Sequence, residues 1–238
     1  MKHRIRTWCL AVQFCPLILL ADLPTTIEVD TSQAPKLEAW CTKAQSEMTA
    51  WYPRIRNLLA DEGFSPPNKI ILKGKDSEKG VGGTAGATIT IYSGWIQKHP
   101  DDLGMVIHEL THVIQHYPSP NPGWVTEGIA DYLRWAIYEG KPLTWFPLSQ
   151  EPSGYTRGYQ VAAGFLLWLE SGPAFGIVRK LNKAMREGKY SDHLFEESSG
   201  KSLPELWTLY QDARKRASPS PERSSRVNPS TSNTEAKP

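Results

Sequence analysis

Residues 100–116 read Pro-Asp-Asp-Leu-Gly-Met-Val-Ile-His-Glu-Leu-Thr-His-Val-Ile-Gln-His, and both the fold and the site can be predicted outward from them. When these residues are placed at about 100° each, the apolar ones fall in a single arc, which is typical of a helix with one buried face. They are Leu103, Val106, Ile107, Leu110, Val113 and Ile114. Asp101 and Asp102 would lie at the positive end of the helix dipole. The stretch therefore predicts an amphipathic helix that begins near residue 101.

Two histidines lie on this predicted helix, away from its buried face. His108 and His112 are only about 40° apart around the axis, so both imidazoles can reach one metal ion. Glu109 lies about 100° further round from His108, where its carboxylate can face a water molecule on that ion. A catalytic zinc site takes three protein ligands and keeps a fourth position open. A third ligand is therefore expected from elsewhere in the chain.

Two residues are candidates for the third ligand. His116 continues the histidine row but lies about 6 Å beyond His112 along the axis, so one straight helix cannot bring all three to one ion. The longer motif that recruits a third histidine needs a glycine where this chain has Gln115. Prolines between residues 118 and 122 would end the helix and allow a second helix to return beside it. The sequence therefore favours Glu127 on that second helix.

The second helix is predicted over residues 123–138 and carries a further carboxylate beside Glu127. Asp131 lies four residues later on the same face, where it can accept the free ring N–H of a ligand histidine. Arg134 is placed to pair with Asp131. An ordinary solvated acidic face is the alternative, but apolar residues bracket these carboxylates, and a buried carboxylate needs a partner. A metal ion would supply that partner.

The rest of the chain predicts a small sheet before these helices and a mostly helical half after them. Strands are expected at 26–30, 69–72 and 87–92, with a glycine-rich stretch at 80–86 and a long helix capped by Ser32. The strand at 87–92 alternates apolar and polar residues and is a candidate edge for pairing with an extended peptide. The sequence thus predicts one α+β domain over residues 22–216.

The two ends of the chain differ in composition from this domain. Residues 1–21 have a basic start and then an apolar run that is shorter than the roughly 20 residues of a membrane-spanning helix. They predict an export signal, a secreted or periplasmic protein and no stable membrane insertion. Residues 217–238 are rich in Ser, Pro, Asn, Thr and charges, and they predict a disordered tail.

Charge and cysteine content exclude several classes of protein. Lys2, Arg4 and Arg6 precede the first acidic residue, Asp22, and leave 24 basic against 25 acidic residues in the remaining chain. This near-neutral body indicates no nucleic-acid partner. Cys41 is the one cysteine after the predicted signal, which excludes a disulfide framework and a cysteine-rich structural zinc site.

Three segments resemble the plant basic secretory proteins and their bacterial relatives. They are His-Glu-Leu-Thr-His-Val-Ile-Gln at 108–115, Glu-Gly-Ile-Ala-Asp-Tyr-Leu-Arg at 127–134 and Gly-Tyr-Gln-Val-Ala-Ala-Gly-Phe-Leu at 158–166. The resemblance extends from about Thr26 to Gln211. Because that family is peptidase-like and lies within the zincins whose third ligand is Glu, it implies a zincin-like fold. The near-neutral body departs from strongly cationic members, so their binding modes are not carried over.

The resemblance also implies a zinc-dependent peptidase that acts on a peptide or protein. It implies one Zn²⁺ held by His108, His112 and Glu127, with Glu109 as general base and Asp131 supporting a ligand histidine as in thermolysin-like enzymes. The Gly-Tyr match makes Tyr159 the first candidate for the oxyanion donor, and Tyr155 and His193 are the other candidates. A zinc hydrolase of a non-peptide bond would use the same ligands. A non-catalytic peptide- or carbohydrate-binding protein of the same fold is the other alternative, although it would not need Glu109.

Overall fold

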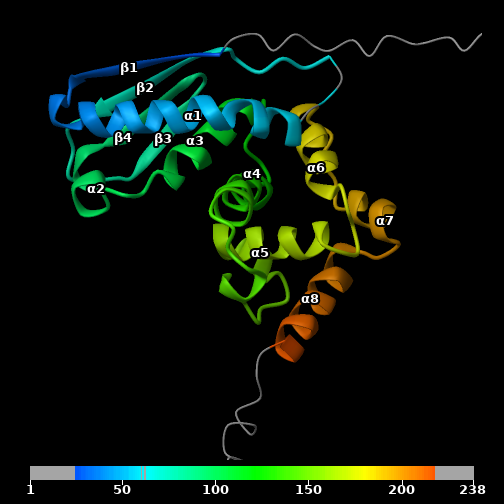
Figure 1. The fold of residues 1–238 in the computed structure, drawn as a ribbon. Helices are drawn as coiled ribbons and strands as arrows, with labels where there is room; N and C mark the ends of the chain where they lie inside the picture. Colours follow the sequence, from blue (N-terminus) through cyan, green and yellow to red (C-terminus); the bar gives the residue numbers. More distant parts are fainter. Residues whose placement is uncertain (1–24, 60, 62, 218–238) are drawn as a thin grey trace, which may run out of the picture.

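The computed structural model describes residues 25–59, 61 and 63–217 (Figure 1). The predicted export signal at 1–21 lies outside the described residues. Ala217, the first residue of the predicted tail, ends the last helix, and residues 218–238 also lie outside.

A four-stranded sheet forms the N-terminal part of the molecule. Its strands are β1 (Thr26–Gln33), β2 (Lys69–Lys75), β3 (Gly82–Ala85) and β4 (Thr88–Tyr92). The order is β1-β2-β4-β3, with β1, β2 and β4 parallel and β3 antiparallel to β4. Alternate side chains of the two inner strands are fully buried, which is the period-2 pattern of a sheet with one covered face. These side chains are Ile70, Leu72, Ile89 and Ile91.

Two predictions for the N-terminal part of the chain were wrong: the edge strand of the sheet and the cap of the long helix. The strand at 87–92 is not an edge, because β4 lies between β2 and β3. The edge is β3, which comes from the glycine-rich stretch and turns into β4 through Gly86 at φ 59°. Ser32 is not a helix cap: it lies within β1, and its hydroxyl donates to Asp30 Oδ1 at 2.6 Å instead of accepting from a helix N–H.

Two helices cover the same face of the sheet. A short turn at Pro35–Leu37 leads into α1 (Glu38–Leu58), which packs on β1 and β2. After α2 (Ser93–Lys98), helix α3 (Gly104–Gln115) lies beside α1 and packs on β3 and β4. Figure 1 shows α3 between the sheet and the helices that follow it.

The C-terminal half of the described chain is helical. It contains α4 (Gly123–Asp131), a π-helical continuation (Tyr132–Tyr138), α5 (Tyr159–Glu170), α6 (Ile177–Arg186), α7 (His193–Ser199) and α8 (Leu203–Ala217), with short 3₁₀ turns at Leu143–Trp145 and Gly154–Thr156. The helix predicted at 123–138 is therefore present, but its second half is wound more loosely, with Glu139 N–H donating to Arg134 C=O at 2.9 Å. The protein is a mixed α+β structure. Across the part of the chain described, no helix is long and apolar enough to cross a membrane.

Candidate metal centre

A cleft of about 690 Å³ lies between the β3 edge, α3, α4 and the start of α5. One wall comes from the edge strand and its turn, through Gly82, Gly83, Thr84 and Gly86. The floor carries His108, Glu109 and His112 from α3. A second cavity of about 660 Å³ adjoins it and shares Val81, Arg134, Trp135 and Gln160 with the cleft. The cleft therefore continues past the first turn of α3.

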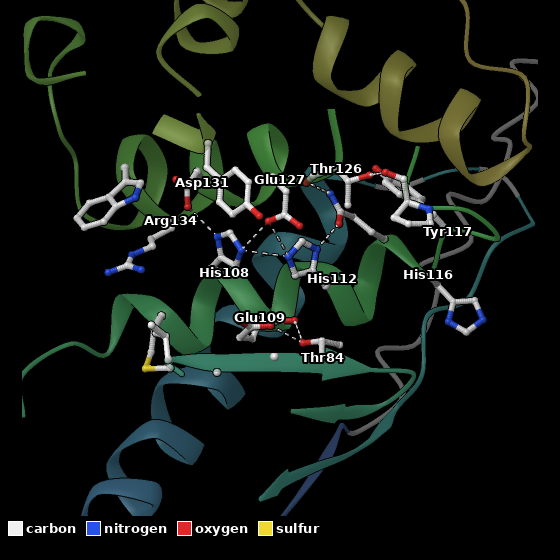
Figure 2. Close-up of a pocket in the computed structure, with 18 of the residues that line it drawn as sticks. Thr84, His108, Glu109, His112, His116, Tyr117, Thr126, Glu127, Asp131 and Arg134 are labelled. Atoms are coloured by element: carbon white, nitrogen blue, oxygen red, sulfur yellow. Dashed lines mark hydrogen bonds and ion pairs between the residues drawn. The ribbon is translucent and has the colours of Figure 1, made fainter. Parts of the chain in front are cut away.

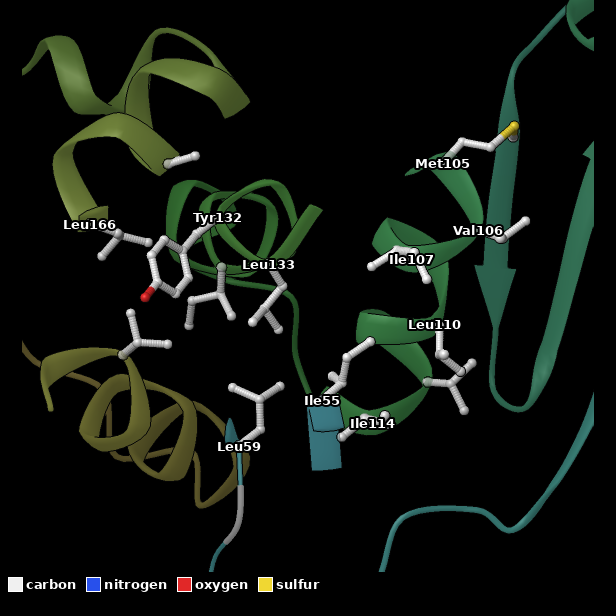
Figure 3. Close-up of a cluster of buried hydrophobic side chains, with 14 of the residues drawn as sticks. Ile55, Leu59, Met105, Val106, Ile107, Leu110, Ile114, Tyr132, Leu133 and Leu166 are labelled. Carbon is white, nitrogen blue, oxygen red and sulfur yellow. The ribbon is translucent and has the colours of Figure 1, made fainter. Parts of the chain in front are cut away.

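Helix α3 is held on both flanks, which leaves only its cleft side open. Figure 3 shows Met105 and Val106 directed toward the strands and Ile107 directed toward the C-terminal helices. Each of these side chains is at most 2% exposed. The buried arc predicted from the sequence is thus present, and the two histidines lie outside it with side chains 13% and 17% exposed.

The side chains of His108, His112 and Glu127 converge in the cleft (Figure 2). The two Nε2 atoms are 3.0 Å apart. Glu127 Oε2 lies 3.2 Å from His108 Nε2 and 3.5 Å from His112 Nε2. The predicted return of the second helix is what brings Glu127 here, because α4 packs against α3. These three residues could hold a metal ion.

The charges in this group are strongly coupled. Burial disfavours the charged form of His108, but hydrogen bonds to Asp131 and Glu127 outweigh it and raise the pKa of His108 to about 9. Burial likewise opposes ionisation of Glu127, yet its contacts with His108 and His112 lower the pKa of Glu127 to about 2. Without a metal, a proton on His108 therefore neutralises the Glu127 carboxylate, and a cation would replace that proton.

The other ring nitrogen of each histidine has its own partner. His108 Nδ1 lies 2.7 Å from Asp131 Oδ1, so Asp131 occupies the supporting position predicted for it. His112 Nδ1 lies 2.7 Å from Gln115 Oε1. The Gln115 amide in turn donates from Nε2 to the carbonyl of Thr126 at 2.9 Å. Both rings are thus oriented with Nε2 toward Glu127.

Glu109 lies in the same cleft and faces the edge strand. The Thr84 hydroxyl is 2.7 Å from Glu109 Oε2 and 3.0 Å from the Glu109 carbonyl oxygen. Figure 2 shows these two residues close to β3 and separate from the three converging side chains. Thr84 is a partner that the sequence did not reveal, since it lies 25 residues away in a glycine-rich stretch.

Of the three residues considered as oxyanion donors, only Tyr159 lines the cleft. Its ring stacks on that of His108, with centroids 6.3 Å apart, and the residue is 54% exposed. The negative charge of Glu127 and partial burial raise the pKa of the Tyr159 phenol. Tyr155 is buried among Trp124, Phe165 and Trp207 instead. His193 is exposed on α7, where it pairs with glutamates of its own helix.

Two further residues from the sequence analysis, His116 and Arg134, lie away from the three converging side chains. His116 ends α3 in the left-handed conformation, with φ 46°, and its ring lies near Phe64 and away from the convergence point (Figure 2). Arg134 does not pair with Asp131 as predicted. The π-helical winding after Asp131 turns Arg134 toward the start of α3, where Nη2 donates to Asp102 Oδ1 at 2.7 Å and Nε lies 3.5 Å from Glu139 Oε1.

Comparison with known proteins identifies a family to which this chain is similar. The model of a protein family described as the peptidase of plants and bacteria matches residues 43–210, which is well over half of the chain. The matched range includes β2–β4, the cleft and all of its converging side chains. No curated protein and no solved structure matches.

Proposed function

The chain belongs to this family of plant and bacterial peptidases, and we propose that it is a zinc-dependent peptidase. The match also confirms the resemblance to the basic secretory proteins. The observation that carries the proposal is the convergence of His108, His112 and Glu127 next to Glu109 in an open cleft. Each step beyond the family membership depends on this geometry.

The donor set supports zinc as the metal. Two imidazole nitrogens and one carboxylate oxygen are a known set of ligands for catalytic zinc. An ion that lies about 2.0–2.1 Å from three ligands at tetrahedral angles holds those ligands about 3.3 Å apart. The observed separations are 3.0, 3.2 and 3.5 Å. When bound, zinc would polarise a substrate carbonyl and make a water molecule easier to deprotonate.

Glu109 is the residue that we assign to proton transfer. Its carboxylate lies in the cleft one residue from a ligand, so it can take a proton from an attacking water molecule and deliver it to the leaving amine. The Thr84 hydroxyl holds one oxygen of this carboxylate through the 2.7 Å contact. The other oxygen has no protein partner in the described part of the chain and is available for the proton.

Tyr159 is assigned to the oxyanion that forms on the substrate. An ordinary tyrosine phenol is already protonated at neutral pH, and the upward shift of the Tyr159 pKa acts in the same direction, so the hydroxyl can donate a hydrogen bond. Its position over His108 at the mouth of the cleft supports this role. The role can be tested with Tyr159→Phe, which keeps the ring and removes the donor.

The edge strand β3 supports an extended peptide as the substrate. Its second edge is unpaired within the sheet and lines the cleft opposite the histidines. A peptide could add to this edge through backbone hydrogen bonds. The sheet edge, the ligand helix α3 and the returning α4 also support the zincin-like fold that we propose for the chain.

The function can be tested by metal analysis together with cleavage of a peptide library. We expect one zinc per chain and peptide cleavage by the wild type. Glu109→Gln should retain zinc and lose at least about 100-fold in kcat, because a general base contributes about 10²–10⁴-fold. Glu38→Gln, at an exposed position on α1, is the matched control and should be fully active.

The same experiment separates the alternatives. Zinc bound without cleavage of any peptide or ester would favour a binding protein. Cleavage of esters alone would favour a hydrolase of a non-peptide bond. Native protein that binds no zinc would overturn the proposal.

We also propose that the chain is exported, on the basis of the basic and apolar pattern of residues 1–21. N-terminal sequencing of the protein from the producing cells tests this proposal. A mature chain that begins near residue 22 is expected, and one that retains Met1 would contradict it.

A further inference from the structure

Gln115 is a buried polar residue whose side chain lies between the metal site and α4. It is the last residue of α3 and is 1% exposed. One end of its amide contacts His112 Nδ1 at 2.7 Å, and the other end contacts the carbonyl oxygen of Thr126 at 2.9 Å. Thr126 directly precedes Glu127. A single side chain therefore connects one histidine ligand with the backbone next to the carboxylate ligand.

The chemistry of these two contacts allows only one orientation of the amide. A carbonyl oxygen can only accept, so the NH₂ group of Gln115 must face Thr126. The amide oxygen then faces His112, and because this oxygen can only accept, His112 must carry its proton on Nδ1. In the neutral ring, which is the form that ligates a metal, the lone pair is then on Nε2, which lies 3.5 Å from Glu127 Oε2.

We propose that Gln115 is a positioning residue for metal binding, which rests on the zinc site assigned above. It holds His112 in the tautomer that ligates through Nε2. Through its hydrogen bond to the Thr126 carbonyl, it also links α3 to the backbone of α4 next to Glu127. Gln115 would therefore determine both the tautomer of His112 and the position of Glu127.

The backbone of Gln115 is held in place as well. Arg186 on α6 donates from Nε to the carbonyl of Gln115 at 3.2 Å and from Nη2 to the carbonyl of Ile114 at 3.0 Å. Arg186 is itself paired with Asp61 and stacked over Phe64 at 3.6 Å. These contacts satisfy the C-terminal carbonyls of a buried helix end. The backbone that carries the Gln115 side chain is therefore held in place, as a positioning residue requires.

A purely structural role would have a different consequence. A buried amide that only fills the core would, when replaced, lower the free energy of unfolding and leave the zinc affinity of the folded protein unchanged. A group that orients a ligand should change the affinity by about 10–100-fold. Metal affinity, measured on folded protein and without any peptide, separates these two roles.

Three variants test the proposal. Gln115→Met keeps the volume and removes both hydrogen bonds. Gln115→Glu keeps an acceptor for His112 Nδ1–H but sets a carboxylate oxygen against the Thr126 carbonyl. Thr111→Val is the control, because Thr111 is fully buried on the same helix and, among the residues that the structure describes, its hydroxyl bonds only to the carbonyl of Ile107.

Zinc dissociation constants, from competition with a chelator, give the main result. Gln115→Met should bind zinc about 10–100-fold more weakly than wild type, Gln115→Glu should lose less, and Thr111→Val should bind as wild type. Wild-type affinity in folded Gln115→Met would overturn the proposal. A wild type that binds no zinc would overturn the proposed function as well, so the two failures are distinguishable.

A measurement on the wild type decides the matter if the variants fail to fold. In zinc-loaded protein labelled with ¹⁵N-histidine, the Nδ1–H proton of His112 should give a resolved signal that exchanges slowly with water. Absence of that signal, while the Nδ1–H signal of His108 is present, would overturn the role of Gln115.

Discussion

His108 and His112 lie one turn apart on α3 and present the same atom to the same site, yet their supports differ. His108 Nδ1 contacts a carboxylate, Asp131, that comes from α4 and is 8% exposed. His112 Nδ1 contacts a neutral amide, Gln115, from its own helix. One support is charged and comes from the neighbouring helix. The other is uncharged and comes from α3 itself, although the same amide also donates to the Thr126 carbonyl of α4.

This difference between the two supports affects the net charge of the metal site. With Zn²⁺ bound, the charges of Glu127 and Asp131 would balance the ion when both histidines are neutral. A second carboxylate behind His112 would make the group net negative and weaken the pull of the ion on a substrate carbonyl. The amide orients His112 without adding charge.

Removal of the charged support should have the largest effect on metal binding. We expect Asp131→Ala to weaken zinc binding by about 100-fold, at the upper end for residues behind a ligand, because His108 loses both its orientation and a compensating charge. Asp131→Asn should lose less, since the amide oxygen can still accept from Nδ1–H. Chelator competition measures both, and Asp212→Ala in α8 is the control. A smaller loss in Asp131→Ala than in Gln115→Met would contradict the contrast.

The charged support should also determine how zinc binding depends on pH. In the metal-free protein the pKa of His108 is raised to about 9, so at pH 7.5 this ring carries a proton that zinc must displace. Apparent affinity should therefore rise about tenfold per pH unit between pH 7 and 8.5 and level off above about pH 9. Calorimetry in buffers of different ionisation enthalpy should detect this proton release at pH 7.5, and less release in Asp131→Asn. Equal proton release in both proteins would show that Asp131 does not raise the basicity of His108.

Features encoded by local periodicity could be predicted from the sequence. The spacing of apolar residues on α3 placed His108 and His112 outside the buried face, and the proline-rich turn returned Glu127 to the same cleft. Helical geometry within one segment and one chain reversal are enough for these inferences. Asp131 could be placed for the same reason, because it lies one turn from Glu127.

Features that depend on distant partners could not be predicted in the same way. The π-helical winding after Asp131 turns Arg134 away to Asp102, and no periodicity signals that change. The β3 edge comes from a glycine-rich stretch without apolar alternation. Gln115 was informative in the sequence only as the residue where a glycine would be needed for a third histidine. Its contact with the Thr126 carbonyl arises only once α4 has packed.

The contact between α4 and α5 offers a third test, with a smaller effect. Gly128 follows Glu127, and a Cβ there would lie 2.8 Å from Ala162 Cβ, a methyl group that cannot rotate away. Gly128→Ala should lower the free energy of unfolding by about 1 kcal/mol, because overpacking outweighs the gain in helix propensity. Urea denaturation of the metal-free protein measures it.

The same variant also distinguishes the two histidine supports. A displaced α4 should disturb the His108–Asp131 contact, which spans two helices, more than the His112–Gln115 contact within α3. The Nδ1–H signal of His108 should therefore shift more than that of His112. Gly172→Ala is the control, since its nearest neighbour is 3.8 Å away. Equal shifts of both histidine signals would contradict the distinction.

The smallest effect is expected at Thr84, whose hydroxyl supports the proposed general base and neither histidine. Thr84→Val keeps the shape of the side chain and removes the hydrogen bond to Glu109. A hydrogen bond worth about 1 kcal/mol corresponds to about fivefold in kcat/KM, with zinc affinity unchanged. Thr88→Val on β4 is the matched control and should leave both quantities as in wild type. A weakened zinc site in Thr84→Val would mean that the edge strand holds the metal ligands, and metal binding and proton transfer would then not have separate supports.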